Sequence, residues 1–285
     1  MDSHTSARRR RKHLIGIVAL ATCLVATYSS ALLTRPAASA STELPEDDPP
    51  IGPEAGPEGA ASTPTAAPDA SAETKAGPSE LGERVDCRHV KCVALTFDDG
   101  PGPYTSALLR ELAAHRALGT FFVVGGNVAE HPDILRETYL EGHEIGSHTW
   151  SHADLTRLSA AGIRKELSRT DHAIKAAIGI TPQLVRPPYG AFNKFVLRQM
   201  RRPLVLWDVD TLDWQLRDRA KVTRKALKLV RPGSIILFHD IHLSTVRAMP
   251  HVLDTLSKRG YHFVTVSQLF DGKVPDVAYA RDPRL

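Results

Sequence analysis

The sequence predicts an α/β fold, a single incomplete (distorted) β/α barrel of about seven parallel strands with the functional site at the strand C-terminal ends. Seven short apolar runs rich in β-branched and aromatic residues predict the strands. Helical patterns lie between most of these runs, and such alternation favours right-handed crossovers and a mainly parallel sheet. No GxGxxG motif follows any run, which argues against a doubly wound nucleotide-binding sheet.

Residues 1–40 are typical of an export signal. Arg8 to Lys12 form a basic region, Leu14 to Leu33 span twenty residues without a charge, and Ala38-Ser39-Ala40 offers a small-x-small cleavage site. Twenty apolar residues are also enough to span a bilayer, so a cleaved signal peptide and an uncleaved signal anchor are both open. Either one places the rest of the chain outside the cytoplasmic membrane, secreted or anchored by this segment.

Residues 41–83 are expected to form a disordered linker. They hold ten acidic side chains against one lysine, with Pro, Gly or Ala at 21 of 43 positions and no aromatic residue. Such a segment cannot bury enough apolar surface to offset the entropy of ordering it.

Residues 84–285 are predicted to form one folded domain of basic character. The whole chain carries +4, the linker −9 and residues 1–40 carry +5, which leaves +8 for the domain. A surface of this sign favours an anionic polymer such as cell wall. No arginine-rich helix interleaved with aromatic residues indicates nucleic acid, so we expect no nucleic-acid partner.

The elements follow one another along this domain. Cys87 and Cys92 lie beside the first strand, where a disulfide is favoured outside the cytoplasm and a zinc knuckle with His89 is the alternative. The expected strands are 91–97, 119–124, 143–148, 183–187, 204–209, 234–239 and 261–266. Helical patterns, one of them with Ser159 as N-cap and Gly179 as its end, cover 104–115, 132–141, 159–179, 193–201, 218–230 and 248–259.

Polar side chains follow several strands where each is predicted to end: Asp98, Asp99, His148, Arg186, Asp210 and His239. Each one alone has an ordinary explanation. Asp98-Asp99-Gly100-Pro101 also fits a tight turn, and two histidines four residues apart are more often structural than ligands. Active sites of parallel barrels are built at the carboxyl ends of the strands, and the coincidence of these residues at one end therefore predicts a site.

A catalytic metal site is the first hypothesis for this end of the sheet. His148 and His152 can converge on one ion, and one carboxylate from the end of the first strand completes three protein ligands. Three ligands leave positions open for water and substrate. This ligand type fits Zn²⁺ best and also Co²⁺, Ni²⁺ or Mn²⁺, so we expect one divalent ion.

Five motifs follow one another along the domain: Thr96-Phe97-Asp98-Asp99-Gly100, His148-Thr149-Trp150-Ser151-His152, Arg186-Pro187-Pro188-Tyr189-Gly190, Asp210-Thr211-Leu212-Asp213-Trp214 and Leu237-Phe238-His239. In this order they resemble the five signatures of the polysaccharide deacetylases, carbohydrate esterase family four. The resemblance covers about residues 92–270, nearly the whole predicted domain.

The resemblance implies a division of labour among the polar residues. Asp99, His148 and His152 would hold the metal, Asp98 would be the general base, and His239 would be the general acid.

The resemblance also implies roles for the neighbours of these groups. Arg186 would orient Asp98 and keep it ionised, and Asp210 would pair with the imidazole of His239. The backbone N–H of Tyr189 would help to stabilise the oxyanion. Trp214 and Leu237 would form the wall of the pocket that takes the acetyl methyl group.

The implied activity is metal-dependent removal of N-acetyl groups from N-acetylglucosamine units of an extracytoplasmic polysaccharide, with release of acetate. Peptidoglycan or a chitin-type glycan would be the substrate and partner, residues 84–285 the catalytic domain, and the protein a monomer. O-deacetylation of acetylxylan-type esters is an alternative. A catalytically silent wall-binding module would lack Asp98 or His239, and both are present; an unrelated metallopeptidase is disfavoured because HExxH is absent.

Overall fold

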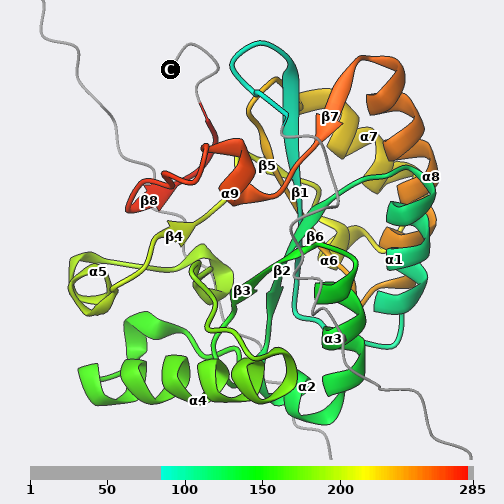
Figure 1. Cartoon of the computed structure of the whole chain (residues 1–285). Helices are drawn as coiled ribbons and strands as arrows, with labels where there is room; N and C mark the ends of the chain where they lie inside the picture. The colour runs from blue at the N-terminus through cyan, green and yellow to red at the C-terminus, as the bar shows by residue number, and fades with distance from the viewer. Residues whose placement is uncertain (1–84, 282–285) are drawn as a thin grey trace, which may run out of the picture. The chain divides into compact units, whose positions relative to one another are not determined.

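The computed structural model describes residues 85–281 (Figure 1). The predicted signal, residues 1–40, and the predicted linker, residues 41–83, lie outside the described residues. Between residues 85 and 281, no helix is both long and apolar enough to cross a membrane.

The centre of the fold is a parallel sheet in the order β3-β2-β1-β6-β5. Its strands are β1 (Lys91–Asp98), β2 (Gly119–Val123), β3 (Glu144–Ser147), β5 (Val209–Asp210) and β6 (Ile235–His239). A further strand, β7 (Tyr261–Phe263), pairs with the first residues of β1. The register sets Asp98 opposite Phe122 on one side and His239 on the other, so the last residues of the central strands lie at one level. The predicted parallel α/β class is confirmed.

Beyond β3 the sheet continues only through short contacts, so the strands form an open arrangement. Single-residue bridges join Ser147 to Val185 and Val185 to Leu204. From there β4 (Leu204–Val205) pairs with β8 (Val277–Ala278), a two-residue strand that the sequence pattern does not predict.

Two predicted strands differ from the structure for identifiable reasons. The run 183–187 becomes one bridging residue, because Pro182, Pro187 and Pro188 have no N–H to donate to a ladder. The run 204–209 divides into β4 and β5. Between them, the Asp208 carboxylate accepts the N–H of Ile235, the first residue of β6.

Helices cover the predicted helical patterns. They are α1 (Thr105–Ala114), α3 (Pro132–Leu140), α4 (Ala160–Ile178), α5 (Lys194–Gln199), α7 (Arg219–Leu229) and α8 (Leu243–Lys258). Ser159 caps α4 by accepting the N–H of Gly162, and Gly179 ends this helix in the left-handed conformation, both as predicted. The helix α8 begins five residues before the predicted start, because its apolar face already includes Val246, and it carries Pro250 in its interior.

Some short helices were not predicted. They are α2 (Gly125–Glu130), α6 (Asp213–Leu216), α9 (Val266–Leu269) and the two 3₁₀ turns Leu155–Arg157 and Pro188–Gly190. The reason is that most of them have four residues or fewer and α2 begins with two glycines, which disfavour a helix.

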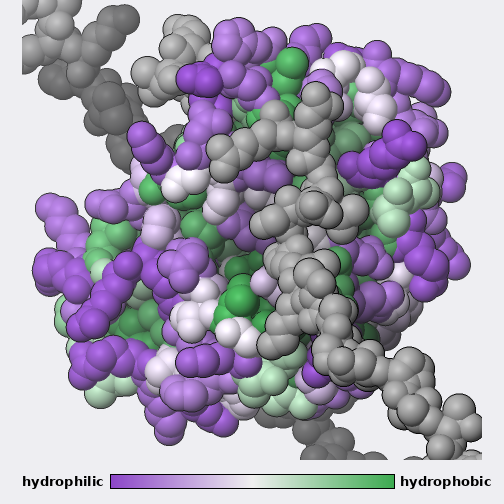
Figure 2. Space-filling view, viewed as in Figure 1, coloured by the Kyte–Doolittle hydropathy of each residue, from purple (hydrophilic) through white to green (hydrophobic). Residues whose placement is uncertain are grey.

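The main core lies between the sheet and the helices α1 and α8. Phe97 of β1 is fully buried, with its ring 5.0 Å from that of Phe121 and 5.7 Å from that of Phe238. On the face seen in Figure 2, hydrophilic residues predominate and apolar residues form small patches between them.

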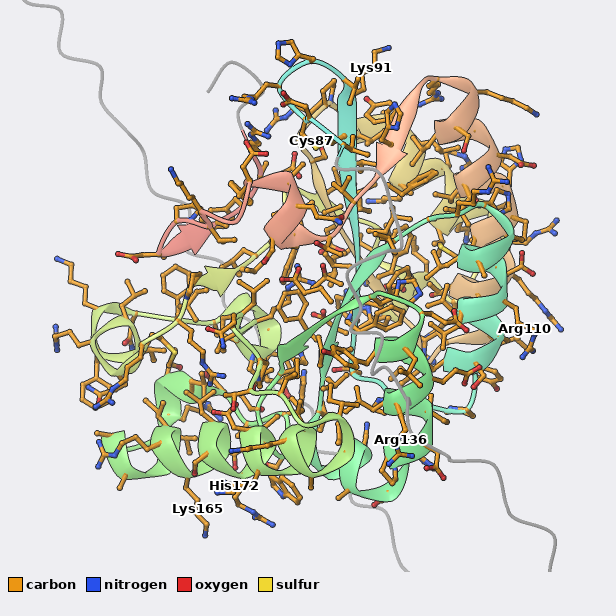
Figure 3. The ribbon with its side chains drawn as sticks, viewed as in Figure 1. Cys87, Lys91, Arg110, Arg136, Lys165 and His172 are labelled. Carbon is orange, nitrogen blue, oxygen red and sulfur yellow. A yellow bond between two sulfur atoms is a disulfide. The ribbon has the colours of Figure 1, made fainter. Side chains whose placement is uncertain are left out.

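Cys87 and Cys92 form a disulfide that ties the turn before β1 to the second residue of the strand (Figure 3). The zinc-knuckle alternative is therefore wrong, because the two sulfur atoms are bonded to each other.

Candidate active site

The carboxyl ends of the central strands bring together residues that are far apart in the chain. Asp98 and His239 end the paired strands β1 and β6, and His148 follows the last residue of β3. Arg186 follows the bridging residue Val185.

Asp99, His148 and His152 form a cluster with the spacing of a metal site. Their ligand atoms all lie within 4.8 Å of one another, and Asp99 Oδ1 is 3.5 Å from His148 Nε2 and 3.4 Å from His152 Nε2. Asp99 Oδ1 is buried and has no hydrogen-bond partner among the described residues. A buried carboxylate oxygen that faces two imidazole nitrogens needs a cation, so the three residues fit a divalent ion.

His148 is oriented for this task by its other ring nitrogen. Nδ1–H donates to the carbonyl oxygen of Arg186 at 2.7 Å, which leaves Nε2 to face Asp99. Burial lowers the pKa of His148 to about 3, so the imidazole is neutral and its Nε2 lone pair is free.

Asp98 lies beside the cluster but has a different partner. Its Oδ1 accepts a hydrogen bond of 2.8 Å from Arg186 Nη1, and both side chains are buried. Arg186 is held in turn by the Thr96 hydroxyl, by the carbonyl oxygens of Val205 and Leu206, and by the face of Phe122 at 4.2 Å.

The pKa of Asp98 is raised, with burial as the largest cause, although the charge of Arg186 acts to lower it. The resemblance implied that Arg186 keeps Asp98 ionised. Arg186 acts in that direction, and burial of the carboxylate acts against it. A raised pKa suits a carboxylate that has to accept a proton.

Asp213, and not Asp210, is the partner of His239. Asp213 Oδ1 lies 2.8 Å from His239 Nδ1, and its Oδ2 accepts the backbone N–H of His239 and the Thr245 hydroxyl, each at 2.7 Å. The Asp210 carboxylate accepts the N–H of Leu212 instead, at 2.8 Å. The prediction that Asp210 pairs with His239 is therefore wrong.

The local backbone explains this correction. Asp210 ends β5 and stabilises the turn that follows it, where Leu212 has a φ of 52°. This turn carries Asp213, the first residue of α6, to the imidazole. The motif contains both aspartates, three residues apart. The sequence alone does not show which of the two pairs with His239.

The partner sets the protonation of His239. Burial alone would lower the pKa of this imidazole, but the hydrogen bond and charge of Asp213, together with the charges of Asp98 and Asp99, raise it to about 9. His239 is therefore protonated at neutral pH and can act as an acid.

The three predicted substrate-binding residues occupy different environments. Tyr189 is exposed, has a φ of 62°, and its ring centroid lies 4.7 Å from that of His152. Trp214 is half exposed and follows Asp213 in α6, whereas Leu237 is buried in β6. Their contacts with substrate stay a prediction.

Glu166 of α4 is a residue that the sequence analysis did not identify. Its Oε2 accepts the backbone N–H groups of Trp150 and Ser151, each at 2.9 Å, and thus holds the loop between His148 and His152. It lies outside the five motifs, so no local pattern marks it.

Comparison with known proteins identifies the family. A chitooligosaccharide deacetylase of a Bradyrhizobium species is 34% identical over 203 residues, which cover 65% of this chain and 93% of the relative. The chain belongs to the polysaccharide deacetylase family. The family model described as polysaccharide deacetylase matches residues 86–203 of the chain.

Other members of the polysaccharide deacetylase family agree. The solved structure of the T48 deacetylase with substrate has 53% sequence identity and a TM-score of 0.67, with 68% of this chain and 99% of that chain covered. A peptidoglycan-N-acetylglucosamine deacetylase of Listeria monocytogenes is 40% identical over 185 residues. That match covers 65% of this chain and only 40% of the length of the relative.

Proposed function

We propose that this polysaccharide deacetylase is a metal-dependent hydrolase that removes N-acetyl groups from N-acetylglucosamine units of an extracytoplasmic polysaccharide and releases acetate. The observation that carries the proposal is the separation of two adjacent carboxylates. Asp98 is bonded to Arg186, whereas Asp99 faces the two imidazoles of His148 and His152. One carboxylate is thus placed to move protons and the other to hold an ion.

The proposed metal is one divalent ion held by Asp99, His148 and His152, with Zn²⁺ favoured and Co²⁺, Ni²⁺ or Mn²⁺ compatible with the same ligands. When bound there, such an ion would polarise the acetamide carbonyl and acidify water.

The protein side chains supply the proton transfers of the proposed reaction. Arg186 occupies Oδ1 of Asp98, so Oδ2 is the atom that accepts the proton of the attacking water. His239 donates a proton from Nε2 to the leaving amine, because Asp213 holds Nδ1. Water and the amide are consumed, and acetate and a free amino sugar are formed. The Tyr189 backbone N–H is proposed to bind the developing oxyanion, with Trp214 and Leu237 beside the acetyl methyl group.

The proposed substrate is an acetylated glycan of the peptidoglycan or chitin type, and we favour peptidoglycan. The Listeria relative is named for peptidoglycan and the Bradyrhizobium relative for chitooligosaccharide. The predicted export signal of residues 1–40 and the predicted linker of residues 41–83 support the choice, because they would hold the enzyme outside the cytoplasm near the wall. We propose that the protein acts there as a monomer, secreted or anchored.

The test of the proposed reaction uses the purified full chain. Peptidoglycan, chitopentaose and acetylxylan are offered side by side, and products are identified by mass spectrometry before and after exhaustive chelation. We expect loss of one acetyl group per event from an N-acetylated glycan, abolished by chelation and restored by Zn²⁺. Full activity after chelation would refute metal dependence, and activity on acetylxylan alone would refute N-deacetylation.

The proposed location is tested by fractionating cells that express the full chain. We expect the domain in the medium or with the membrane, with Cys87 and Cys92 oxidised. Recovery in the cytoplasmic fraction with the signal intact and both thiols reduced would contradict the proposal.

A further inference from the structure

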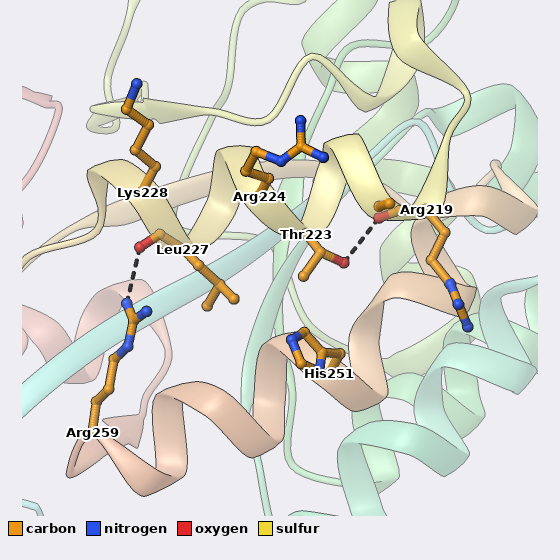
Figure 4. Close-up of a pocket in the computed structure, with 8 residues that line it drawn as sticks. Arg219, Thr223, Arg224, Leu227, Lys228, His251 and Arg259 are labelled. Atoms are coloured by element: carbon orange, nitrogen blue, oxygen red, sulfur yellow. Dashed lines mark hydrogen bonds between the residues drawn. The ribbon is translucent and has the colours of Figure 1, made fainter.

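A basic groove lies between α7 and α8 on the outer surface of the domain (Figure 4). Its volume is about 630 Å³, and its charged lining residues are Arg219, Arg224, Lys228 and Arg259, with His251 beside them. We call this feature the α7–α8 groove. It takes no part in the deacetylation chemistry proposed above.

Within residues 85–281, the cations of the α7–α8 groove form no ion pair with an acidic side chain. α7 carries five basic side chains and no acidic one, and within residues 85–281 the side chains of Arg224 and Lys228 have no hydrogen bond or ion pair. The nearest acids along the chain are engaged elsewhere. Asp218 caps α7 through the N–H of Lys221, and Asp254 of α8 pairs with His115.

The basic lining of the groove favours a chain that carries several negative charges. Arg224 and Lys228 are four residues apart, about one turn and about 6 Å along α7, whereas Arg219, five residues before Arg224, lies about 140° around the helix from it. Arg259 lies across from them and donates to the Leu227 carbonyl at 2.9 Å (Figure 4). Arg224 and Lys228 thus form a pair on one side of α7, and Arg219 points to the other side of the helix, toward α8 (Figure 4).

Other polyanions fit this groove less well. The axes of two packed helices lie about 8–10 Å apart, which is too narrow for a nucleic-acid duplex. The lining has no Phe, Tyr or Trp side chain on which the bases of a single strand could stack. A bilayer surface would contact protruding side chains rather than a concave groove.

We propose that the α7–α8 groove binds a phosphodiester-linked wall polymer of the poly(glycerol phosphate) type. Arginine and lysine bind phosphate groups by charge-assisted hydrogen bonds. The helix α7 starts at Arg219, five residues after Trp214 in the chain. A bound polymer would hold the enzyme on the wall next to its glycan substrate. The choice of a wall polymer as the ligand rests on the proposed function, whereas the presence of the basic groove is independent of it.

The test measures binding of the full chain to fluorescently labelled poly(glycerol phosphate) by anisotropy at several salt concentrations. The variant Arg224→Ala/Lys228→Ala removes two groove cations. The control Arg164→Ala/Lys165→Ala removes the same charge from α4, where Lys165 points away from the sheet (Figure 3). Both pairs are exposed, so both variants should fold, and thermal unfolding verifies this.

We expect the groove variant to bind about tenfold more weakly and to lose about two units of salt slope, and the control to bind like the wild type. Equal losses in both variants, or no binding by the wild type, would overturn the proposal. The proposal would also be overturned if, at equal charge, the protein bound phosphatidylglycerol vesicles or a single-stranded oligonucleotide more tightly than poly(glycerol phosphate). Because no turnover is measured, failure of the proposed deacetylation leaves this result intact.

A second inference concerns Glu166, which holds the loop that carries two of the metal-ligating residues. Besides the two amides, its carboxylate accepts the Ser151 hydroxyl, and Arg169 of the same helix lies 3.9 Å over the Trp150 ring. From the other side, the N–H of Gly125 in α2 donates to the Thr149 carbonyl at 2.9 Å.

This loop needs external support because its backbone is strained. Thr149 and His152 have φ values of 69° and 57°, in the left-handed region that costs about 1–3 kcal/mol for a residue other than glycine. We infer that Glu166 is a positioning residue that holds His152 in its ligating geometry. It acts through the amides of Trp150 and Ser151 and does not touch the ion or the substrate.

The test compares Glu166→Ala, Glu166→Gln and the control Asp171→Asn, which weakens an ion pair of α4 with Arg202 away from the loop. Zn²⁺ affinity is measured by chelator competition, and unfolding is measured without metal. We expect about ten- to hundredfold weaker Zn²⁺ binding in Glu166→Ala, partial rescue in Glu166→Gln, and no change in the control. Zn²⁺ affinity within twofold of wild type in Glu166→Ala would overturn the inference, as would a loss fully matched by Asp171→Asn.

Discussion

Two adjacent aspartates of the site contact different partners and so have different roles. Asp98 points to Arg186 and is almost fully buried, whereas Asp99, with a φ of 73°, turns toward His148 and His152. The positive φ directs the two side chains of consecutive residues to different partners. Substitution of either one should therefore affect a different property.

We predict that Asp98→Asn abolishes turnover but retains the metal, whereas Asp99→Asn loses the metal and the activity together. Asparagine at 98 still offers an oxygen to Arg186 but cannot act as a base, and asparagine at 99 removes the charge that faces the two imidazoles. Elemental analysis and turnover assays check this. If Asp98→Asn empties the site while Asp99→Asn does not, the roles are reversed.

We predict that Asp213→Asn moves the alkaline limb of the activity profile to lower pH by about one unit or more. His239 must carry a proton to act as an acid, so activity is present below its pKa of about 9 and is lost as the pH rises through that value. Removal of the Asp213 charge lowers this pKa. The measurement is kcat/KM against pH.

Asp210→Asn is the matched control for that profile. Its amide oxygen can still accept the N–H of Leu212, so we expect the alkaline limb to stay in place. A shift in Asp210→Asn with none in Asp213→Asn would restore the partner that the resemblance implied.

At the scale of elements, β1 supports both the core and the site. It pairs with β2, β6 and β7, its apolar side chains are buried, and its last residue is Asp98. Packing against β1 thus fixes the position of the polar residues at the ends of the strands.

We predict that Phe97→Ala lowers the free energy of unfolding by about 3–5 kcal/mol, because the ring is fully buried between Phe121 and Phe238 and alanine leaves a cavity. Chemical denaturation measures the change. Leu140→Ala at the exposed end of α3 is the control and should stay within about 0.5 kcal/mol of wild type. A loss below about 1 kcal/mol in Phe97→Ala would contradict the role of this packing.

At the scale of the whole molecule, the disulfide Cys87–Cys92 secures the start of the described domain. Disulfides persist outside the cytoplasm, so this bond agrees with the proposed location. It closes a short loop, and the expected stabilisation is correspondingly modest.

We predict that Cys87→Ala/Cys92→Ala destabilises the protein by about 2 kcal/mol, because the unfolded chain regains the entropy of a loop whose ends are five positions apart. Urea denaturation measures this loss. Wild-type protein under dithiothreitol is the matched comparison and should unfold at nearly the same urea concentration as the variant. Unchanged stability in both would show that the bond does not constrain the unfolded chain.

Much of the fold and site could be predicted because the signals are local. Apolar runs marked the strands of the central sheet, Ser159 and Gly179 marked the ends of α4, and ordered motifs marked the metal cluster. The sequence pattern does not predict α6 and β8, because these segments are too short to show a helical or strand periodicity. It also does not predict the single bridge at Val185, where neighbouring prolines interrupt the hydrogen bonds between strands.

A periodicity or a motif within a few residues predicted the parallel α/β class, the two histidines of the metal cluster with an adjacent carboxylate, and the acid and base candidates. The packed structure was needed to show that Asp213 rather than Asp210 holds His239, that Glu166 supports the histidine loop, and that α7 and α8 enclose a basic groove. These features depend on how a turn bends and on which helices pack together. Contacts between distant segments are set by the packing of the whole chain, so no short stretch of sequence contains them.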